Sequence, residues 1–341
     1  MYIIGMGDLL LALRAPHNER LLQTPCLIPA FSGAEMNVCV SCSQFGLKTK
    51  FIGAVPDNAL GKAAIKELKK ESVEPYVVFA GKRMSLCYVE KGANQRGSTV
   101  LYDRENISLM YVVPADYNWD DIFKEASWFH ITGITPALSQ STAELALFAV
   151  KKAKEKGLTV SCDLNFRKKL WNYGKQAKEV MPAIVEHCDV LIGNEEDIQH
   201  SLGIVSDNID TVKGHIEVEH YKEILDKVFD IYPNIKKIAV SLRTSISADH
   251  NRWSALLADR GKVITAKSYD IKDIVDRVGG GDSFAGGLIS GFNLFDTDED
   301  ALEFATAASC LKHSVPGDLN LVSFEEVTAL MRGDGSGRVQ R

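Results

Sequence analysis

Three consecutive glycines followed by an aspartate, Gly279 to Asp282, form the stretch of this sequence best suited to chemistry. Apolar residues recur at helical spacing after Asp282, so we expect a helix over residues 283–293. The unpaired amides at the start of a helix, beside a glycine backbone that other groups can approach closely, form a site for an anion such as phosphate. Asp282 would stand where that anion meets a second reactant, and its carboxylate can orient or accept the proton of an attacking hydroxyl group.

The three glycines and Asp282 also allow other interpretations. The simplest is a tight turn in which Asp282 caps the helix, an interaction that stabilises a helix by about 1 kcal/mol. A Walker A loop requires Lys followed by Ser or Thr after the glycines, and this pair does not follow. The dinucleotide fingerprint G-x-G-x-x-G fails at its third glycine, which is Phe284 after Gly279 and Leu10 after Gly5. A dinucleotide-dependent dehydrogenase is therefore poorly supported.

Alternating strands and helices must position this motif. Residues that favour buried strands are 2–5, 50–55, 128–132, 158–165, 189–194 and 236–241. Residues with helical spacing are 34–45, 60–71, 142–156, 177–188 and 300–313, and a further helix is predicted from the capping box at 323–326. Helices that end at a glycine before the next strand are typical of an α/β fold, with a central, mostly parallel sheet flanked by helices.

Two segments interrupt this alternation. Residues 9–32 are extended and contain prolines, and residues 79–112 alternate polar and apolar side chains between glycine-rich turns. Residues 79–112 are predicted to form a small antiparallel sheet, and we expect the two segments to meet as a lid over one end of the α/β core. Residues 1–332 are predicted to form a single domain, and residues 333–341 a disordered tail.

Composition narrows the function classes. The chain of 341 residues has a formal net charge of −6, which argues against a general binder of nucleic acids or anionic membranes. No apolar run approaches the length of a membrane span, and Asp8 lies inside the apolar start, which favours a first strand over a signal peptide. Seven scattered cysteines fit reduced thiols and a cytoplasmic protein, and we expect the Cys39–Cys42 pair to be small buried residues.

The glycine motif has a counterpart in a known family. Residues 276–282 (DRVGGGD) resemble the carboxy-terminal signature D-T-x-G-A-G-D of the ribokinase-like (PfkB) sugar kinases, with Arg277 in place of Thr and Gly280 in place of Ala. The resemblance implies that Asp282 is the catalytic base and that Gly279, Gly280 and Gly281 stabilise the charge that develops on the transferred phosphoryl group.

The amino-terminal signature of the same family also has a match. Residues 31–46 resemble the segment in which a glycine pair and a downstream asparagine hold the sugar; here Ser32-Gly33 replaces Gly-Gly, and Asn37 is present. The two signatures occur in the right order, and the resemblance extends from residue 1 to about residue 332. It implies a ribokinase-like fold with a small β-sheet lid.

Three further segments resemble one branch of this family, the 2-keto-3-deoxygluconate (KDG) kinases. They are residues 102–104 (YDR), 163–171 (DLNFRKKLW) and 317–320 (GDLN). The branch phosphorylates a sugar acid on its terminal hydroxyl group with ATP. The chemistry is consistent, because a planar guanidinium grips a carboxylate through charge-assisted hydrogen bonds, whereas a neutral sugar needs no such cluster.

The resemblance assigns roles to individual residues. The implied sugar-binding residues are Gly33, Asn37, Tyr88, Tyr102, Arg104, Arg167 and Asp318. The implied nucleotide-binding residues are Asn165, Arg167, Ser241, Arg243, Gly279 and Gly281. Asn194 and Asp197 resemble an N-x-x-E motif that helps to place Mg²⁺ through water, with Asp in place of the usual Glu. Structural alternatives remain open: Arg104 can pair with Asp103 or Glu105, Tyr88 and Tyr102 can be ordinary sheet aromatics, and 194–197 can be a charged helix start.

One segment departs from the family pattern. After the strand at 236–241 the family has a glycine-containing turn over the nucleotide, but residues 241–250 contain no glycine and supply Arg243 and several hydroxyl groups instead. This departure allows a different mode of ATP binding or a different preferred phosphate donor.

The sequence therefore predicts a sugar kinase that uses ATP and Mg²⁺ on a small sugar acid, with KDG as the first candidate. A fructokinase or a 5-dehydro-2-deoxygluconokinase is the alternative of the same class, and a non-catalytic sugar sensor is the alternative of another class. The helix dipole is expected to favour an ionised Asp282 at neutral pH. An exposed edge of the lid sheet suggests a homo-oligomer.

Overall fold

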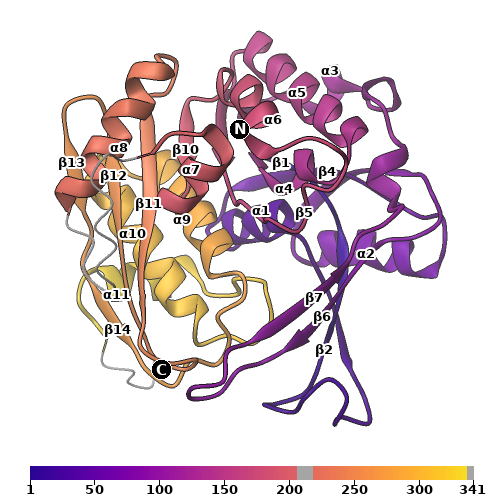
Figure 1. Cartoon of the computed structure of the whole chain (residues 1–341), viewed down its shortest axis with the longest axis horizontal. Helices are drawn as coiled ribbons and strands as arrows, with labels where there is room; N and C mark the ends of the chain where they lie inside the picture. Colours follow the sequence, from indigo (N-terminus) through magenta and orange to yellow (C-terminus); the bar gives the residue numbers. More distant parts are fainter. Residues whose placement is uncertain (206–217, 336–341) are drawn as a thin grey trace.

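Two β-sheets organise the computed structural model of this chain, which describes residues 1–205 and 218–335 (Figure 1). The larger sheet has ten strands among these residues. Its spatial order is β13 (Val263–Thr265), β12 (Asn251–Ala258), β11 (Lys237–Ser245), β10 (Val190–Ile192), β9 (Thr159–Asp163), β8 (Ala126–Thr132), β1 (Tyr2–Met6), β4 (Lys48–Val55) and β5 (Val73–Phe79), with β14 (Tyr269–Ile271) also paired to β12. The strands from β11 to β5 are parallel, whereas β12 runs antiparallel to its neighbours.

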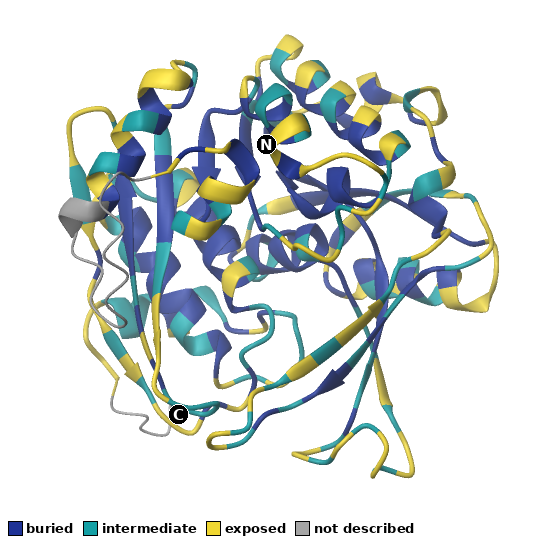
Figure 2. Cartoon of the chain, in the orientation of Figure 1, coloured by how far each residue is buried: buried dark blue, intermediate teal, exposed yellow. Residues whose placement is uncertain are grey.

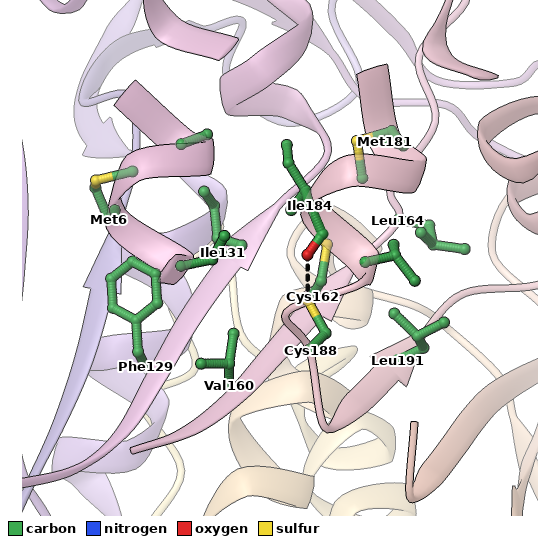
Figure 3. Packing of buried hydrophobic residues seen from close by; sticks show 14 of the residues in the cluster. Met6, Phe129, Ile131, Val160, Cys162, Leu164, Met181, Ile184, Cys188 and Leu191 are labelled. Carbon is green, nitrogen blue, oxygen red and sulfur yellow. Dashed lines mark hydrogen bonds between the residues drawn. The ribbon is translucent and has the colours of Figure 1, made fainter. Parts of the chain in front are cut away.

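Helices cover both faces of the large sheet. Their bounds among the described residues are α1 (Ala34–Gln44), α2 (Ala59–Lys70), α3 (Trp119–Ile122), α4 (Ile134–Ala137), α5 (Gln140–Glu155), α6 (Ala177–Val185), α7 (Glu195–Leu202), α8 (Val218–Ile231), α9 (Gly280–Leu294), α10 (Asp298–Lys312) and α11 (Phe324–Met331). Alternate residues of β1 point to opposite faces: Ile3 belongs to the apolar cluster of α1 and α9, whereas Met6 belongs to the cluster of α5 and α6. Figure 3 shows part of the second cluster, with Phe129 of β8 and Met181 of α6.

The second sheet has four strands in the order β3 (Ile28–Ser32), β2 (Leu10–Arg14), β6 (Ser85–Glu90) and β7 (Thr99–Asp103). We call it the lid sheet. It projects from the α/β body and carries exposed residues along its outer strands (Figures 1 and 2). The antiparallel pairing predicted within residues 79–112 is confirmed for β6 and β7, whereas β2 and β6 run parallel. They come from the two predicted lid segments, and each segment enters the sheet in the same direction.

The tip of the lid sheet touches the far side of the body. The loop between β6 and β7 meets the turn between β11 and β12, where the Ala248 amide donates to the Asn94 carbonyl oxygen over 2.7 Å. The Asn94 amide in turn donates to the Asp249 carboxylate over 3.3 Å. The lid sheet therefore contacts the α/β body at its tip as well as at its base.

The predicted elements agree closely with the structure where the pattern was strongly periodic. The helix expected over 283–293 is α9, which begins three residues earlier, and Ser323 caps α11 as the capping box predicts. The antiparallel strands β12 to β14 were not predicted. Of the predicted tail, residues 336–341 lie outside the described residues, and the single-domain assignment of 1–332 stays a prediction. In the part of the chain that the structure describes, no helix has the length and apolar character needed to cross a membrane.

Candidate active site

A cleft of about 690 Å³ lies between the lid sheet and the carboxyl ends of the parallel strands. Residues at the ends of β9 and β10 line it, together with the start of α9 and residues of β2 and β7. The cleft brings together the predicted site residues Gly33, Asn37, Tyr102, Arg104, Asn165, Arg167, Asn194, Asp197, Ser241, Arg243, Gly279, Gly280, Gly281, Asp282 and Asp318. Tyr88 is the one predicted site residue that does not line it.

The glycines form a tight bend at the start of α9. Gly279 is the N-cap residue, with φ 79°, and a Cβ atom there would lie 2.0 Å from the carbonyl oxygen of Asp318. A Cβ atom on Gly281 would meet nothing within 4 Å, so this glycine faces the open cleft. The amides of Gly281 and Asp282 have no acceptor among the described residues. The bend thus presents free N–H groups at the positive end of the helix dipole, which suits an anion. We call residues 279–282 the anion loop.

Asp282 is the third residue of α9 and does not cap the helix, so the capping interpretation was wrong. The Asn37 side-chain amide donates to Asp282 Oδ2 over 2.7 Å. Burial raises the pKa of Asp282, while Asn37 and the charges of Arg167 and Lys312 lower it. The net change in this pKa is upward because the cost of removing the carboxylate from water is the largest of these effects. Asn37 was predicted to hold the sugar, and its amide nitrogen holds Asp282.

The lid side of the cleft carries a basic and aromatic pair. The Arg104 guanidinium lies over the Tyr102 ring, 4.4 Å from its centroid, and Arg104 Nε is 3.4 Å from Asp8 Oδ2. Burial raises the pKa of Asp8, whereas the Arg104 charge and a 2.5 Å hydrogen bond from Ser85 Oγ lower it. Asp103, an alternative partner for Arg104, forms its ion pair with Arg83. Arg104 therefore pairs with Asp8 and not with Asp103, and its side chain lines the cleft.

Tyr88 was wrongly predicted as a sugar-binding residue. In the lid sheet Cys87 pairs with Tyr102, and Tyr88 pairs with Leu101. Side chains of neighbouring residues in a strand point to opposite faces, so Cys87 shares the cleft face with Tyr102 and Tyr88 lies on the outer face. The prediction was one residue out of register, because the sequence alone does not show which face of β6 meets the cleft.

Acidic and amide side chains line the cleft beyond Asp282. The Asp197 carboxylate accepts hydrogen bonds from the amides of Phe166 (2.9 Å) and Asn194 (3.0 Å), and Asn194 Oδ1 caps α7. Both residues thus form a capping box at a charged helix start, which was the structural alternative for 194–197. Burial raises the pKa of Asp163 well above its usual range, and the charges of Asp197 and Asp282 raise it further. Asp163 therefore lies close enough to Asp197 and Asp282 for their charges to act on it, and the Arg167 charge offsets them in part.

Three arginines gather at one end of the cleft. Burial lowers the pKa of Arg243, and the nearby guanidiniums of Arg277 and Arg167 lower it further. Arg277 donates to the carbonyl oxygens of Ser247 (3.0 Å) and Ala248 (2.8 Å), so it also holds the turn between β11 and β12. The glycine-free segment that departs from the family pattern is this hairpin. The concentration of positive charge suits a polyphosphate.

Some residues of the cleft region were not predicted. Arg277 lines the cleft. Its position in the glycine signature, where the family has Thr, could have indicated this. Ser32 and Asp163 also line it. Arg14 binds Asp276 and Asp318 with its two terminal nitrogens. The alternation of Leu10, Ala12 and Arg14 in one strand was the signal that could have placed Arg14 on the inner face.

The oxygen donors of the cleft suit Mg²⁺ only in part. Among the described residues no cluster of three or more His, Cys, Asp or Glu side chains could hold a metal ion by itself. The available donors are carboxylate and amide oxygens, which are the ligands Mg²⁺ prefers when phosphates and waters supply the rest. The cleft thus fits a metal ion that arrives with a nucleotide.

Comparison with known proteins decides the family. A sequence model described as "pfkB family carbohydrate kinase" matches residues 17–229 and 252–323. The chain belongs to the PfkB family of carbohydrate kinases. The internal gap in the match, 230–251, includes the arginine-bearing strand and turn that depart from the family pattern.

Individual members of the family are similar over nearly the whole chain. The crystal structure of 2-dehydro-3-deoxygluconokinase from Thermotoga maritima is 40% identical with a TM-score of 0.90, and the match covers 98% of each chain. The 2-dehydro-3-deoxygalactonokinase of Haloferax volcanii is 30% identical, with 98% of each chain covered. An Escherichia coli structure solved in complex with ATP and Mg²⁺ is 19% identical with a TM-score of 0.76, covering 97% of this chain and 98% of that one, and so shares the fold.

Proposed function

We propose that this PfkB kinase phosphorylates the terminal hydroxyl group of a keto-deoxy sugar acid, with 2-keto-3-deoxygluconate as the first candidate. The observation that carries the proposal is that Arg104 and Arg167 line the same cleft as Asp282 and the anion loop. A guanidinium on each side of the cleft gives a carboxylate substrate charge-assisted partners, which a neutral sugar would leave unused. The likeness to the Thermotoga maritima enzyme supports the same substrate class.

The proposed chemistry uses the base and the anion loop together. Asp282 orients the terminal hydroxyl group and accepts its proton as the hydroxyl oxygen bonds to the γ-phosphorus of ATP, while the bond from that phosphorus to the leaving ADP breaks. Asn37 occupies Asp282 Oδ2, which leaves Oδ1 for the substrate. The free amides of Gly281 and Asp282 stabilise the negative charge that develops on the phosphoryl oxygens. The lid sheet excludes water, which limits hydrolysis of the phosphate donor.

We propose ATP and Mg²⁺ as the donor and the metal ion. Ser241, Arg243 and Arg277 would bind the nucleotide at one end of the cleft, and Asn194 and Asp197 would hold the metal through water. Mg²⁺ would supply charge neutralisation on the phosphates during transfer. The glycine-free segment at 241–250 would meet the nucleotide with guanidinium groups.

Two closely related sugar acids, KDG and its galactonate epimer, are both candidate substrates. The Haloferax volcanii relative acts on 2-dehydro-3-deoxygalactonate, the epimer of the proposed substrate. Fructose or 5-dehydro-2-deoxygluconate is the alternative outside the 2-keto acids. A sensor without activity is disfavoured because Asp282 and its free anion loop are both present.

The test is ADP release with ATP, Mg²⁺ and a panel of acceptors: KDG, its galactonate epimer, 5-dehydro-2-deoxygluconate and fructose. We expect the highest kcat/KM with one of the two 2-keto acids and poor turnover of fructose, since a neutral sugar offers no carboxylate to the guanidiniums of Arg104 and Arg167. A preference for fructose would contradict the sugar-acid assignment. Binding of the acids without any ADP release would favour the sensor.

We also propose that two copies of the chain pair through the outer face of the lid sheet. Strand register places Leu13, Leu86, Tyr88 and Leu101 on that face, and Leu101 is 52% exposed. A second copy would bury these side chains with an identical face, as a two-fold interface requires. Sedimentation of the wild type as a dimer, and of Leu101→Asp as a monomer, is the expected result. A monomeric wild type at micromolar concentration would contradict the pairing.

A further inference from the structure

Arg14 is the last residue of β2 and lies on the face of the lid sheet that meets the cleft, with Leu10 and Ala12. β2 is an inner strand, paired with β3 on one side and β6 on the other. The Arg14 side chain is only 13% exposed. A guanidinium held this deeply by a central strand has a fixed position relative to the whole lid.

Arg14 joins two segments of the α/β body to the lid. Its Nη1 donates to Asp276 Oδ2 over 2.6 Å, and its Nη2 donates to Asp318 Oδ1. Asp276 also accepts from the amides of Val278 (3.0 Å) and Gly317 (3.1 Å). One arginine therefore connects the segment that leads into the anion loop with the loop after α10.

The contacts of Asp318 extend this connection to the reacting groups. The Asp318 carbonyl packs against Gly279, where it leaves no room for a Cβ atom, so the backbone of Asp318 sets the bend of the anion loop. Its carboxylate accepts from Ser32 Oγ over 2.5 Å. Ser32 lies 3.4 Å from Asn37 Oδ1, and Asn37 donates to Asp282. A continuous set of contacts thus runs from Arg14 to the base.

Charge explains why this arrangement depends on arginine. Asp276 and Asp318 are two largely buried carboxylates on the same guanidinium, each with 9% side-chain exposure. Without the positive charge they repel each other across a weakly screened space, and the segments that carry them separate. A lysine keeps the charge but lacks the planar fork that reaches two carboxylates at once.

We propose that Arg14 is a positioning residue for phosphoryl transfer. It fixes Asp276 and Asp318, so that the lid sheet, the anion loop and the segment from Ser32 to Asn37 keep one geometry. This inference rests on the proposed kinase activity. Arg14 does not line the cleft, so it acts through the two aspartates and not by contact with the substrate. It gives the lid sheet a direct link to the catalytic machinery.

The test compares Arg14→Lys and Arg14→Met with the wild type, using ATP, Mg²⁺ and the best acid of the acceptor panel. We expect Arg14→Met to lower kcat/KM for the acid by roughly 10²-fold with an unchanged KM for ATP, because small displacements of aligned groups have effects of this size. Arg14→Lys should recover only part of the loss. The effects of Arg14→Met and Asp318→Asn should be non-additive, since both break one interaction.

A matched control is Arg83→Met, which breaks another arginine–aspartate pair of the lid region, Arg83 with Asp103, away from the anion loop. It should leave both KM values and kcat near those of the wild type. Thermal unfolding identifies variants that fail to fold, in which case Arg14→Lys carries the test. Wild-type kinetics in Arg14→Lys, or additive effects with Asp318→Asn, would overturn the role of Arg14. An inactive wild type would overturn the proposed function and this inference with it.

Discussion

At the scale of single residues, the proposed role of Asp282 as the catalytic base is the one to test first. Replacement by Asn removes the proton acceptor but keeps the size and the hydrogen bond from Asn37, so kcat should fall by about 10²–10⁴-fold. Because burial raises the pKa of Asp282, the neutral variant should fold at least as stably as the wild type. Steady-state ADP release and thermal unfolding measure the two effects. Turnover close to that of the wild type would remove Asp282 from its role as base.

Glu35 provides a pH prediction independent of catalysis. It is buried on α1, where Thr132 and Thr135 donate to Oε1, and burial raises its pKa from 4.5 to about 7. A carboxyl group whose pKa is higher in the folded state binds its proton more tightly there. Its contribution to stability is therefore full below pH 4.5 and is lost as the pH rises towards 7, by about 3 kcal/mol in all.

Glu35→Gln should remove this pH dependence. The variant should be more stable than the wild type at pH 8, and the difference should shrink or reverse at pH 4.5, where the wild-type carboxyl is protonated. Urea unfolding at both pH values gives the comparison, and the difference between the two proteins cancels other titrating groups. Equal pH profiles of the free energy of unfolding would show that Glu35 does not titrate in this range.

At the scale of elements, the anion loop separates fold from function. Gly279→Ala forces a side chain onto a residue with φ 79° and against the Asp318 carbonyl, so it should cost about 2 kcal/mol of stability or more and abolish activity. Gly281→Ala points into open space, so its stability should change by less than about 0.5 kcal/mol. Its kcat should still fall by roughly 10²-fold, because the methyl group occupies the phosphate position. An active, stable Gly279→Ala protein would contradict this geometry.

The register of β6 gives a second prediction at this scale. Tyr102 faces the cleft, so Tyr102→Leu should raise the KM for the sugar acid several-fold. Tyr88→Leu, on the outer face of the same sheet, should leave that KM unchanged. Measuring both KM values under identical conditions checks the register. A larger effect at Tyr88 would restore the sequence-based assignment.

These elements also show where prediction from sequence succeeds. The motifs at 276–282 and 31–46 each lie within a few residues of a helix start, and Gly279, Asp282 and Asn37 line one cleft, as the family resemblance implied. Tyr88 failed because a strand pattern does not reveal which face meets the core, a property that only the partner strand sets. The direction of the Asp282 pKa change depends on burial, which arises from distant segments and has no local signal.

At the scale of the whole molecule, the α/β alternation predicted the fold class, since parallel strands and covering helices follow from local periodicity. The link from Arg14 to Asp276 and Asp318 could not be predicted in the same way. Asp276 and Asp318 lie 262 and 304 positions after Arg14 in the sequence. The link exists only because the lid sheet folds back over the carboxyl ends of the strands. Long-range ion pairs of this kind are properties of the assembled chain.

The most direct test of the account is identification of the product. The chain would be incubated with ATP, Mg²⁺ and 2-keto-3-deoxygluconate, and the phosphorus NMR spectrum of the product recorded with proton coupling. We predict ADP and a phosphate ester coupled to the two protons of the terminal carbon, with no ester from the Asp282→Asn variant on the same timescale. An ester on another carbon, ADP without any ester, or an equal yield from Asp282→Asn would contradict it.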